Sequence, residues 1–145
     1  MSEPLCGTYY PSIDAKGRMS FPNKLREILG PEFYLCKGHE QGKQYIAVYS
    51  IQAFDEYCNK LSGIAGDIGS AIRRELLAGA DKQVPDKQGR IFISQLLRDH
   101  AGITGDVTVI GNYNRAEIWD CSKYQEDSKS IDPEAYKAAL AGIVL

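Results

Sequence analysis

Two short segments of the sequence combine side chains that could recognise the edge of a DNA base. The first reads DAKGR from Asp14 to Arg18, and the second reads DKQGR from Asp86 to Arg90. An arginine guanidinium can donate two hydrogen bonds to O6 and N7 of a guanine in the major groove. A β-hairpin with a glycine at its tip is narrow enough to enter that groove, and the uncovered N–H groups beside the glycine can approach a phosphate. The two segments therefore predict a pair of DNA-binding turns.

Other polar residues near the turns have two interpretations each. Asp14 and Asp86 are predicted to structure the turns, because an aspartate can accept hydrogen bonds from N–H groups of its own turn. The alternative for the two turn arginines is an exposed ion pair with the aspartate four residues earlier, which contributes about 0–1 kcal/mol. Three further cations lie on expected short helices, where they could contact phosphates or simply form a solvated helix face. They are Lys24, Arg26 and Arg98.

Positive charge gathers at these segments although the whole chain is acidic. The formal net charge is −2, yet residues 14–26 carry +3 and residues 86–98 carry +2. Hydrophobic residues make up 43% of the sequence and charged residues 25%, which is typical of a globular protein rather than a disordered one. Any DNA-binding face must therefore be local.

The elements that position these residues form a repeated unit. Residues 14–30 and 86–102 agree at the Asp, the first Gly, both Arg, the Leu and the final Gly when they are aligned at an offset of 72. In each copy we expect a strand before the turn, over residues 9–13 in the first, then a strand, a short helix, a hairpin and a trailing helix. The first short helix, NKLREIL, follows Pro22 and ends before Gly30, and Ser94 caps the second.

The expected fold is α+β, with two tandem units related by a pseudo-two-fold axis. A unit of about 55 residues buries too little apolar surface to be stable alone, so the two copies should pair. We expect the first unit at residues 7–62, a connecting helix at 63–79, the second unit at 80–127 and a C-terminal helix or tail at 128–145. Ile68, Ile72, Leu76 and Leu77 should share one apolar face of the connecting helix.

The pattern D-x-x-G-R, an apolar strand, Pro or Ser, and L-R-x-x-x-G resembles the swapped-hairpin β-α-β unit of AbrB-like bacterial DNA-binding proteins. Two such units in one chain, with SIDAKGRMSFP early and DKQGRIFISQLLRDHAGI late, resemble the MraZ family from about residue 7 to residue 124. Ser94 departs from the family pattern, in which proline is usual, but it leaves the turn unchanged. The resemblance implies binding loops in both copies. These comprise Lys16, Gly17 and Arg18, and Lys87, Gln88, Gly89 and Arg90.

The resemblance also implies a function. It is that of a sequence-specific transcriptional regulator of the division and cell-wall gene cluster, with repression as the favoured direction. Such a protein acts on direct repeats upstream of its own gene. Its partners are double-stranded DNA and further copies of the same chain, assembled as a ring, and its expected location is the cytoplasm and the nucleoid.

The alternatives are an interaction module and an enzyme. Swapped-hairpin proteins also act as antitoxins that bind a protein partner, although those usually carry one unit and a disordered tail. No nucleotide-binding, serine-hydrolase or zinc-protease motif occurs, so we expect no catalytic residue and no small-molecule substrate. Four cysteines without a C-x-x-C pair, and only two histidines, predict neither a metal site nor a cofactor. No signal peptide and no apolar run of about 20 residues is present, so no membrane partner is expected.

Overall fold

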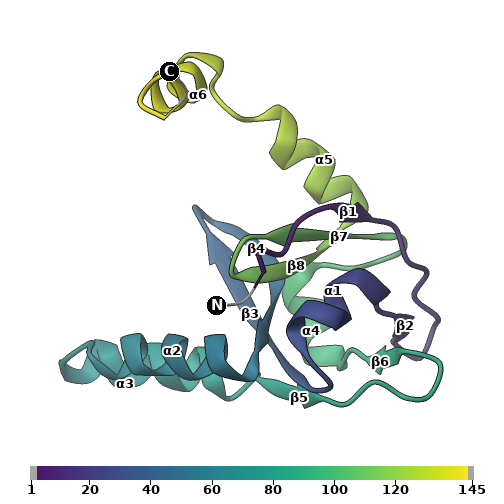
Figure 1. The fold of residues 1–145 in the computed structure, drawn as a ribbon. Helices are drawn as coiled ribbons and strands as arrows, with labels where there is room; N and C mark the ends of the chain where they lie inside the picture. Colours follow the sequence, from purple (N-terminus) through teal and green to yellow (C-terminus); the bar gives the residue numbers. More distant parts are fainter. Residues whose placement is uncertain (1–2, 144–145) are drawn as a thin grey trace.

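The computed structural model describes residues 3–143, which form strands and helices in alternation (Figure 1). The strands are β1 (Thr8–Tyr9), β2 (Arg18–Ser20), β3 (Phe33–Glu40), β4 (Lys43–Ser50), β5 (Asp81–Gln83), β6 (Arg90–Phe92), β7 (Val107–Asn112) and β8 (Arg115–Asp120). The helices are α1 (Asn23–Leu29), α2 (Ile51–Ser62), α3 (Gly66–Leu77), α4 (Gln95–Ala101), α5 (Cys121–Lys129) and α6 (Pro133–Ala141). The α+β class is therefore confirmed.

The strands form one antiparallel sheet and one two-stranded ribbon, and both obey a pseudo-two-fold symmetry. The sheet has the order β1-β7-β8-β4-β3-β5, and the ribbon pairs β2 with β6. The first strand of each copy pairs with a strand of the other copy, since β1 pairs with β7 and β5 pairs with β3. Ile46 pairs directly with Ile118, and Met19 with Ile91, so equivalent residues meet at the axis. The expected pair of swapped-hairpin units is confirmed.

The two copies share one hydrophobic core. It lies between one face of the sheet and the layer made by the ribbon, α1 and α4. Met19 and Phe21, two residues apart, are both buried, and the Phe21 ring lies 5.1 Å from that of Phe33. The other face of the sheet carries a second, aromatic cluster around Tyr45 and Trp119, whose rings stack at 4.9 Å. Neither copy has a core of its own, which explains why they fold as one body.

The short helices begin and end as the sequence predicts, but the first strand is shorter. α1 covers the segment NKLREIL, and Ser94 caps α4 by accepting a hydrogen bond from the Leu97 N–H at 3.3 Å. The strand expected over residues 9–13 stops at Tyr9, and only Ile13 makes a further single bridge. Pro11 has no N–H to donate to a ladder, which accounts for the break.

The trailing helix of the first copy, α2, and the connecting helix, α3, lie side by side (Figure 1). The Arg73 guanidinium fixes α3 to the end of α2 by donating to the carbonyl oxygens of Leu61 and Ile64, at 3.1 and 3.0 Å. Ile68, Ile72 and Leu76 recur every four residues along α3 and so lie on one side of it, where Ile72 and Leu76 are half-buried and Ile68 is 65% exposed.

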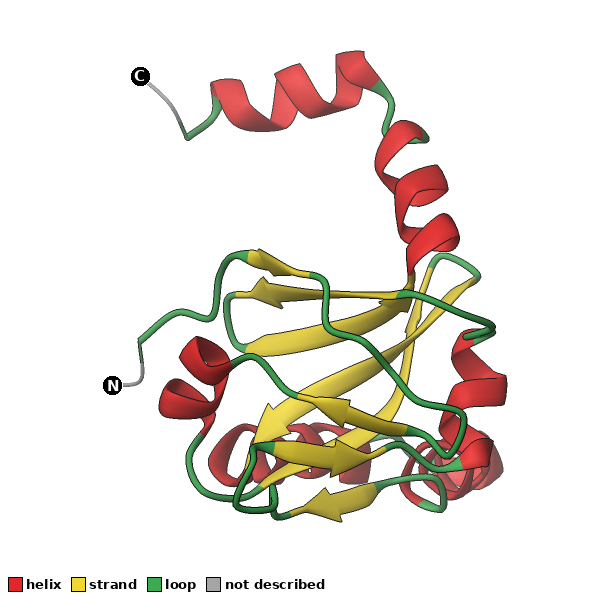
Figure 2. Ribbon diagram, turned by 90° about the vertical axis from the view of Figure 1, so that its right-hand side faces the viewer, coloured by secondary structure: helices red, strands yellow, loops and turns green. Residues whose placement is uncertain are grey.

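The last two helices lead away from the sheet, as Figure 2 shows at the top of the molecule. Asp132 caps α6, since its side chain accepts a hydrogen bond from the Glu134 N–H, and every residue of α6 is exposed. Between residues 3 and 143, no helix has the length and apolar character needed to cross a membrane.

Candidate nucleic-acid interface

The two DxxGR segments form almost identical turns at the two ends of the β2–β6 ribbon. In the first, Oδ1 of Asp14 accepts hydrogen bonds from the N–H groups of Lys16 and Arg18, both at 2.9 Å. In the second, Oδ1 of Asp86 accepts from the N–H groups of Gln88 and Arg90, again both at 2.9 Å. The aspartates therefore structure the turns, as the sequence predicts.

Each aspartate also orients the arginine of its turn. Oδ2 of Asp14 accepts from Nε of Arg18 at 2.8 Å, and Oδ2 of Asp86 accepts from Nε of Arg90 at 2.9 Å. The side chains of Arg18 and Arg90 remain 48% and 42% exposed. In the part of the chain that the structure describes, their terminal Nη groups have no protein hydrogen-bond partner. The ion pair expected as the alternative is thus present, but it uses Nε and leaves the outer edge of each guanidinium free to donate.

The pairing of the ribbon places both arginines on one outward surface. Arg18 pairs in register with Phe92, and Ser20 pairs with Arg90. All four residues are exposed, whereas Met19 and Ile91 between them are buried. A two-stranded ribbon fits into the major groove of B-DNA, so this surface can present two oriented guanidinium groups to base edges.

The same hydrogen bonds lower the pKa of both aspartates below the usual range. For Asp14 the main cause is the Arg18 backbone N–H, and the Arg18 guanidinium and the Lys16 N–H add to it. For Asp86 the backbone N–H and then the guanidinium of Arg90 have the same effect. Both carboxyl groups are therefore ionised at neutral pH and are acceptors only.

These pKa shifts predict a pH-dependent stability. Because the pKa of each aspartate is lower in the folded state, the ionised carboxylate stabilises the fold at pH values above its unfolded pKa of 3.8. This stabilisation is lost as the pH falls through the lower pKa of the folded state. We expect Asp14→Asn and Asp86→Asn to lower the melting temperature at pH 7, and this difference from wild type to shrink steadily below pH 3.8. Thermal unfolding between pH 7 and pH 2 measures it. A difference that stays constant down to pH 2 would contradict the assignment.

The turn glycines are required by both conformation and space. Gly17 has a φ of +93° and Gly89 a φ of +77°, where side chains are disfavoured. A Cβ on Gly17 would lie 2.5 Å from the carbonyl oxygen of Ile93 and 3.0 Å from Cζ of Arg98. A Cβ on Gly89 would lie 2.7 Å from Nη2 of Arg26. Each turn is therefore packed against the other copy.

We expect Gly17→Ala to destabilise the protein more than Gly89→Ala. Both substitutions place a side chain at positive φ, which costs about 1–2 kcal/mol. At Gly17 the new methyl group also meets a backbone oxygen that cannot rotate away, whereas at Gly89 it meets the end of a flexible side chain. Denaturant unfolding measures the difference, with Gly105→Ala as control because a Cβ there meets nothing within 4 Å. Equal losses at the two turns would contradict this ranking.

Arg26 and Arg98 are not simple solvated side chains. Both are half-buried, and their Nε groups donate to the carbonyl oxygens of Phe21 and Ile93, at 3.2 and 3.0 Å. The structure brings each of them to the turn of the other copy, which sequence reasoning missed. The available signal was the arginine that follows leucine at the same place in both helices. Lys16, Lys24 and Lys87, in contrast, are exposed as expected.

The surroundings of the two turns differ although their geometry does not. Three exposed positions near the first turn are polar, while the residues 72 positions later are exposed and apolar. At the turn tip, Gln88 replaces Lys16. The two ends of the ribbon therefore present different chemistry. The polar residues are Ser12, Ser20 and Lys24, and their apolar equivalents are Val84, Phe92 and Leu96.

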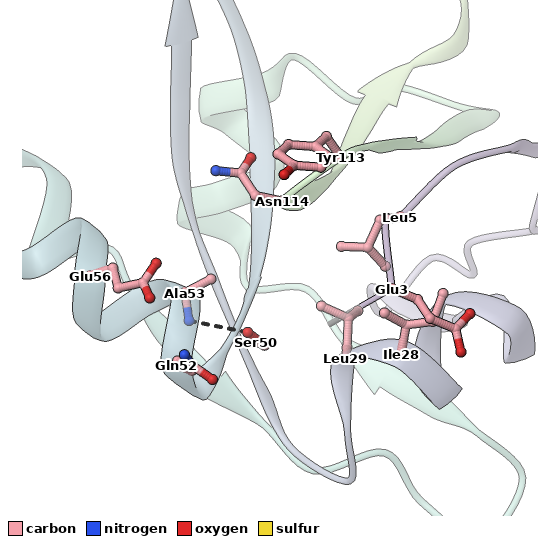
Figure 3. Close-up of a pocket in the computed structure, with 10 residues that line it drawn as sticks. All are labelled: Glu3, Leu5, Ile28, Leu29, Ser50, Gln52, Ala53, Glu56, Tyr113 and Asn114. Atoms are coloured by element: carbon pink, nitrogen blue, oxygen red, sulfur yellow. Dashed lines mark hydrogen bonds between the residues drawn. The ribbon is translucent and has the colours of Figure 1, made fainter. Parts of the chain in front are cut away.

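A small pocket lies between the N-terminal segment, the end of α1, the start of α2 and the β7–β8 turn (Figure 3). Leu5, Leu29 and Tyr113 line it together with two glutamates. The Ser50 hydroxyl there accepts a hydrogen bond from the Ala53 N–H at 3.1 Å, as Figure 3 shows, and so caps α2. None of the predicted DNA-binding residues lines this pocket. Among residues 3–143, no three His, Cys, Asp or Glu side chains form a group suited to a metal ion.

Comparison with known proteins adds to this geometry. The family model described as "MraZ protein, putative antitoxin-like" matches residues 5–65 and 76–140. Three relatives are each named transcriptional regulator MraZ. That of Bifidobacterium longum is 44% identical and covers 80% of this chain and 77% of its own length. That of Finegoldia magna is 42% identical and covers 83% of both chains. That of Acetivibrio thermocellus is 38% identical and covers 94% of this chain and 98% of its own length.

Proposed function

This chain belongs to the MraZ family, and from that premise we propose that it is a sequence-specific DNA-binding transcriptional regulator whose two Asp–Arg turns read base edges. The observation that carries the proposal is the outward surface of the β2–β6 ribbon. There Arg18 and Arg90 are each held by an aspartate through Nε and keep their outer edges free. This arrangement suits guanine recognition, in which an arginine donates to O6 and N7.

In the proposed complex the ribbon lies in the major groove and the surrounding cations contact the backbone. Lys16, Lys87 and Lys24 are exposed and would neutralise phosphates, which positions the ribbon without reading sequence. Gln88 occupies the place of Lys16 in the second turn, and a glutamine can bind an adenine through N6 and N7. The two turns would therefore prefer different bases next to the guanine.

We further propose that the chain acts as a homo-oligomeric ring on direct repeats. The resemblance to the family suggests sites upstream of its own gene, in the division and cell-wall cluster, with repression as the outcome. The exposed apolar side chains of α6, such as Tyr136 and Leu140, favour contacts between copies. A regulator of this kind works in the cytoplasm and on the nucleoid, and the names of its relatives are those of regulators rather than enzymes.

The direct experiment is binding of the purified protein to tiled fragments of the DNA upstream of its own gene, with the salt concentration varied. We expect the protein to bind one or a few tiles tightly and the remaining tiles weakly. Raising the salt concentration should reduce the affinity for the weakly bound tiles by a larger factor than the affinity for the tightly bound ones. Equal binding of all tiles would contradict sequence specificity.

The second candidate is an antitoxin-like module that binds a protein. The description of the matching family as antitoxin-like and the exposed apolar residues Val84, Phe92 and Leu96 favour it. It predicts that no tile is retained above the level of unrelated DNA, so the same experiment separates the two functions.

A further inference from the structure

We infer that Arg26 and Arg98 are positioning residues, each of which holds the DNA-binding turn of the other repeat in place. The inference rests on the proposed function, because its consequence for DNA depends on the turns being the reading elements. It concerns side chains that do not themselves need to touch DNA.

A closed set of contacts joins Arg26 to the second turn. The Phe21 N–H donates to the carbonyl oxygen of Gly89 at 3.0 Å, and the Phe21 carbonyl accepts from Nε of Arg26 at 3.2 Å. The Arg26 guanidinium lies so close to Gly89 that a Cβ there would be 2.7 Å from Nη2 and 2.8 Å from Cζ. Oδ1 of Asn23 accepts a hydrogen bond from Nη2 of Arg26 at 2.8 Å, which fixes the orientation of the guanidinium. The guanidinium is thus anchored in the first repeat and packed on the turn of the second.

Except for the bond to Asn23, the same contacts recur at the other end of the ribbon, where Gln95 occupies the position of Asn23 and bonds to Asp99 instead. The Ile93 N–H donates to the carbonyl oxygen of Gly17 at 2.8 Å, and the Ile93 carbonyl accepts from Nε of Arg98 at 3.0 Å. A Cβ on Gly17 would be 3.0 Å from both Cζ and Nε of Arg98. The packing of an arginine on the turn glycine of the other copy therefore occurs twice, as the pseudo-two-fold symmetry requires.

This geometry explains why an arginine is suited to these two positions. Its planar guanidinium can donate through Nε while its flat side packs on a glycine, and a lysine ammonium has no such plane. A turn with few contacts to the body would otherwise sample several conformations, and DNA binding would then require it to be ordered at a cost in affinity. The arginine orders the turn before DNA arrives.

The first test needs no DNA. We expect Arg26→Gln to increase amide hydrogen exchange about two- to tenfold in residues 86–90 and to leave residues 14–18 unchanged, because it removes the guanidinium that packs on Gly89 together with its anchoring bonds to Phe21 and Asn23. Arg98→Gln should do the reverse. Arg26→Lys, which keeps the charge, should behave like Arg26→Gln. Arg74→Gln is the matched control, because it removes one exposed arginine from α3 whose only protein partner among the described residues is Ser70.

The second test measures binding of single and double variants to the operator, which is the upstream DNA tile that the wild-type protein retains most tightly. Arg26→Gln should weaken operator binding, and it should add little to the loss already caused by Arg90→Ala, because both act on the second turn. In an Arg18→Ala background it should add its full effect, because that substitution disables the first turn. If Arg26 instead served as a phosphate contact, the added loss would be equal in both backgrounds and Arg26→Lys would restore binding.

The outcomes separate this inference from the proposed function. Faster exchange in the turn of the same repeat, in both turns equally, or in neither would overturn the crossed arrangement whatever the DNA experiments give. If Arg18→Ala and Arg90→Ala keep wild-type operator affinity, the proposed function fails, and the exchange measurements still decide whether the arginines hold the turns. If Arg26→Gln unfolds the whole protein, exchange in Arg26→Lys decides in its place.

Discussion

Arg18→Ala and Arg90→Ala are each expected to weaken operator binding strongly, and the double variant to reduce it to near the level of unrelated DNA. Each removes a bidentate base contact of about 1–3 kcal/mol, and the loss is repeated in every chain on the DNA. The aspartate bonds leave the outer edge of each guanidinium free, so this edge is what the substitution deletes. Quantitative gel shifts on the operator and on a scrambled fragment measure the effect.

Stability supplies the control for this prediction. Both arginines are exposed and their ion pairs are surface pairs, so their removal should change the free energy of unfolding by about 0–1 kcal/mol. The ion-pair alternative predicts a similarly small loss of stability but intact DNA binding. Thermal unfolding of the same preparations distinguishes a lost contact from a lost fold.

Lys16→Ala provides a second comparison, because a phosphate contact carries no sequence information. It should weaken operator and scrambled DNA alike, and reduce the salt dependence by about one phosphate contact per engaged chain. If Lys16→Ala abolishes operator binding while both arginine variants keep it, the turns contribute charge alone. Sequence would then be read elsewhere, with the helices that carry Lys24, Arg26 and Arg98 as the next candidates.

Inserting about 5 bp between two repeats of the operator is expected to weaken binding sharply. In a ring, neighbouring chains present the same turn in the same sense, so they engage repeats on one side of the DNA, and half a helical turn moves one repeat to the opposite side. The second contact then no longer benefits from being intramolecular, which can be worth a factor of about 10²–10⁴ in affinity. Titration of both fragments with the same protein measures the change.

The matched control is an insertion that keeps both repeats on the same side of the DNA helix. An insertion of about 10 bp, one full turn, should recover much of the lost affinity because it returns the repeat to the same side. Light scattering of the same sample should give a mass several times that of one chain. Unchanged affinity after the half-turn insertion, or a clean monomer of 16.1 kDa at micromolar concentration, would contradict the ring.

Several features follow from the sequence alone because they depend on local rules. Pro22 and Ser94 define the starts of two helices, since Pro22 has no N–H with which to continue the preceding strand and the Ser94 side chain accepts from a free N–H group of the helix. The repeat at an offset of 72 predicts two paired copies, because neither copy can bury enough apolar surface alone. The aspartate that structures each turn is equally local, since it bonds to N–H groups within four residues.

What only the tertiary structure decided is how the two copies exchange contacts. No local pattern reveals that β1 pairs with β7 and β5 with β3, because the partners are far apart in the chain. The same holds for Arg26 and Arg98. Their spacing fits an exposed helix face, but the swapped pairing brings each guanidinium onto a glycine of the other repeat. The sequence indicated which turn residues are candidates for DNA binding, while the packing of one copy on the other decided which arginines contact those turns, because that depends on contacts between distant segments.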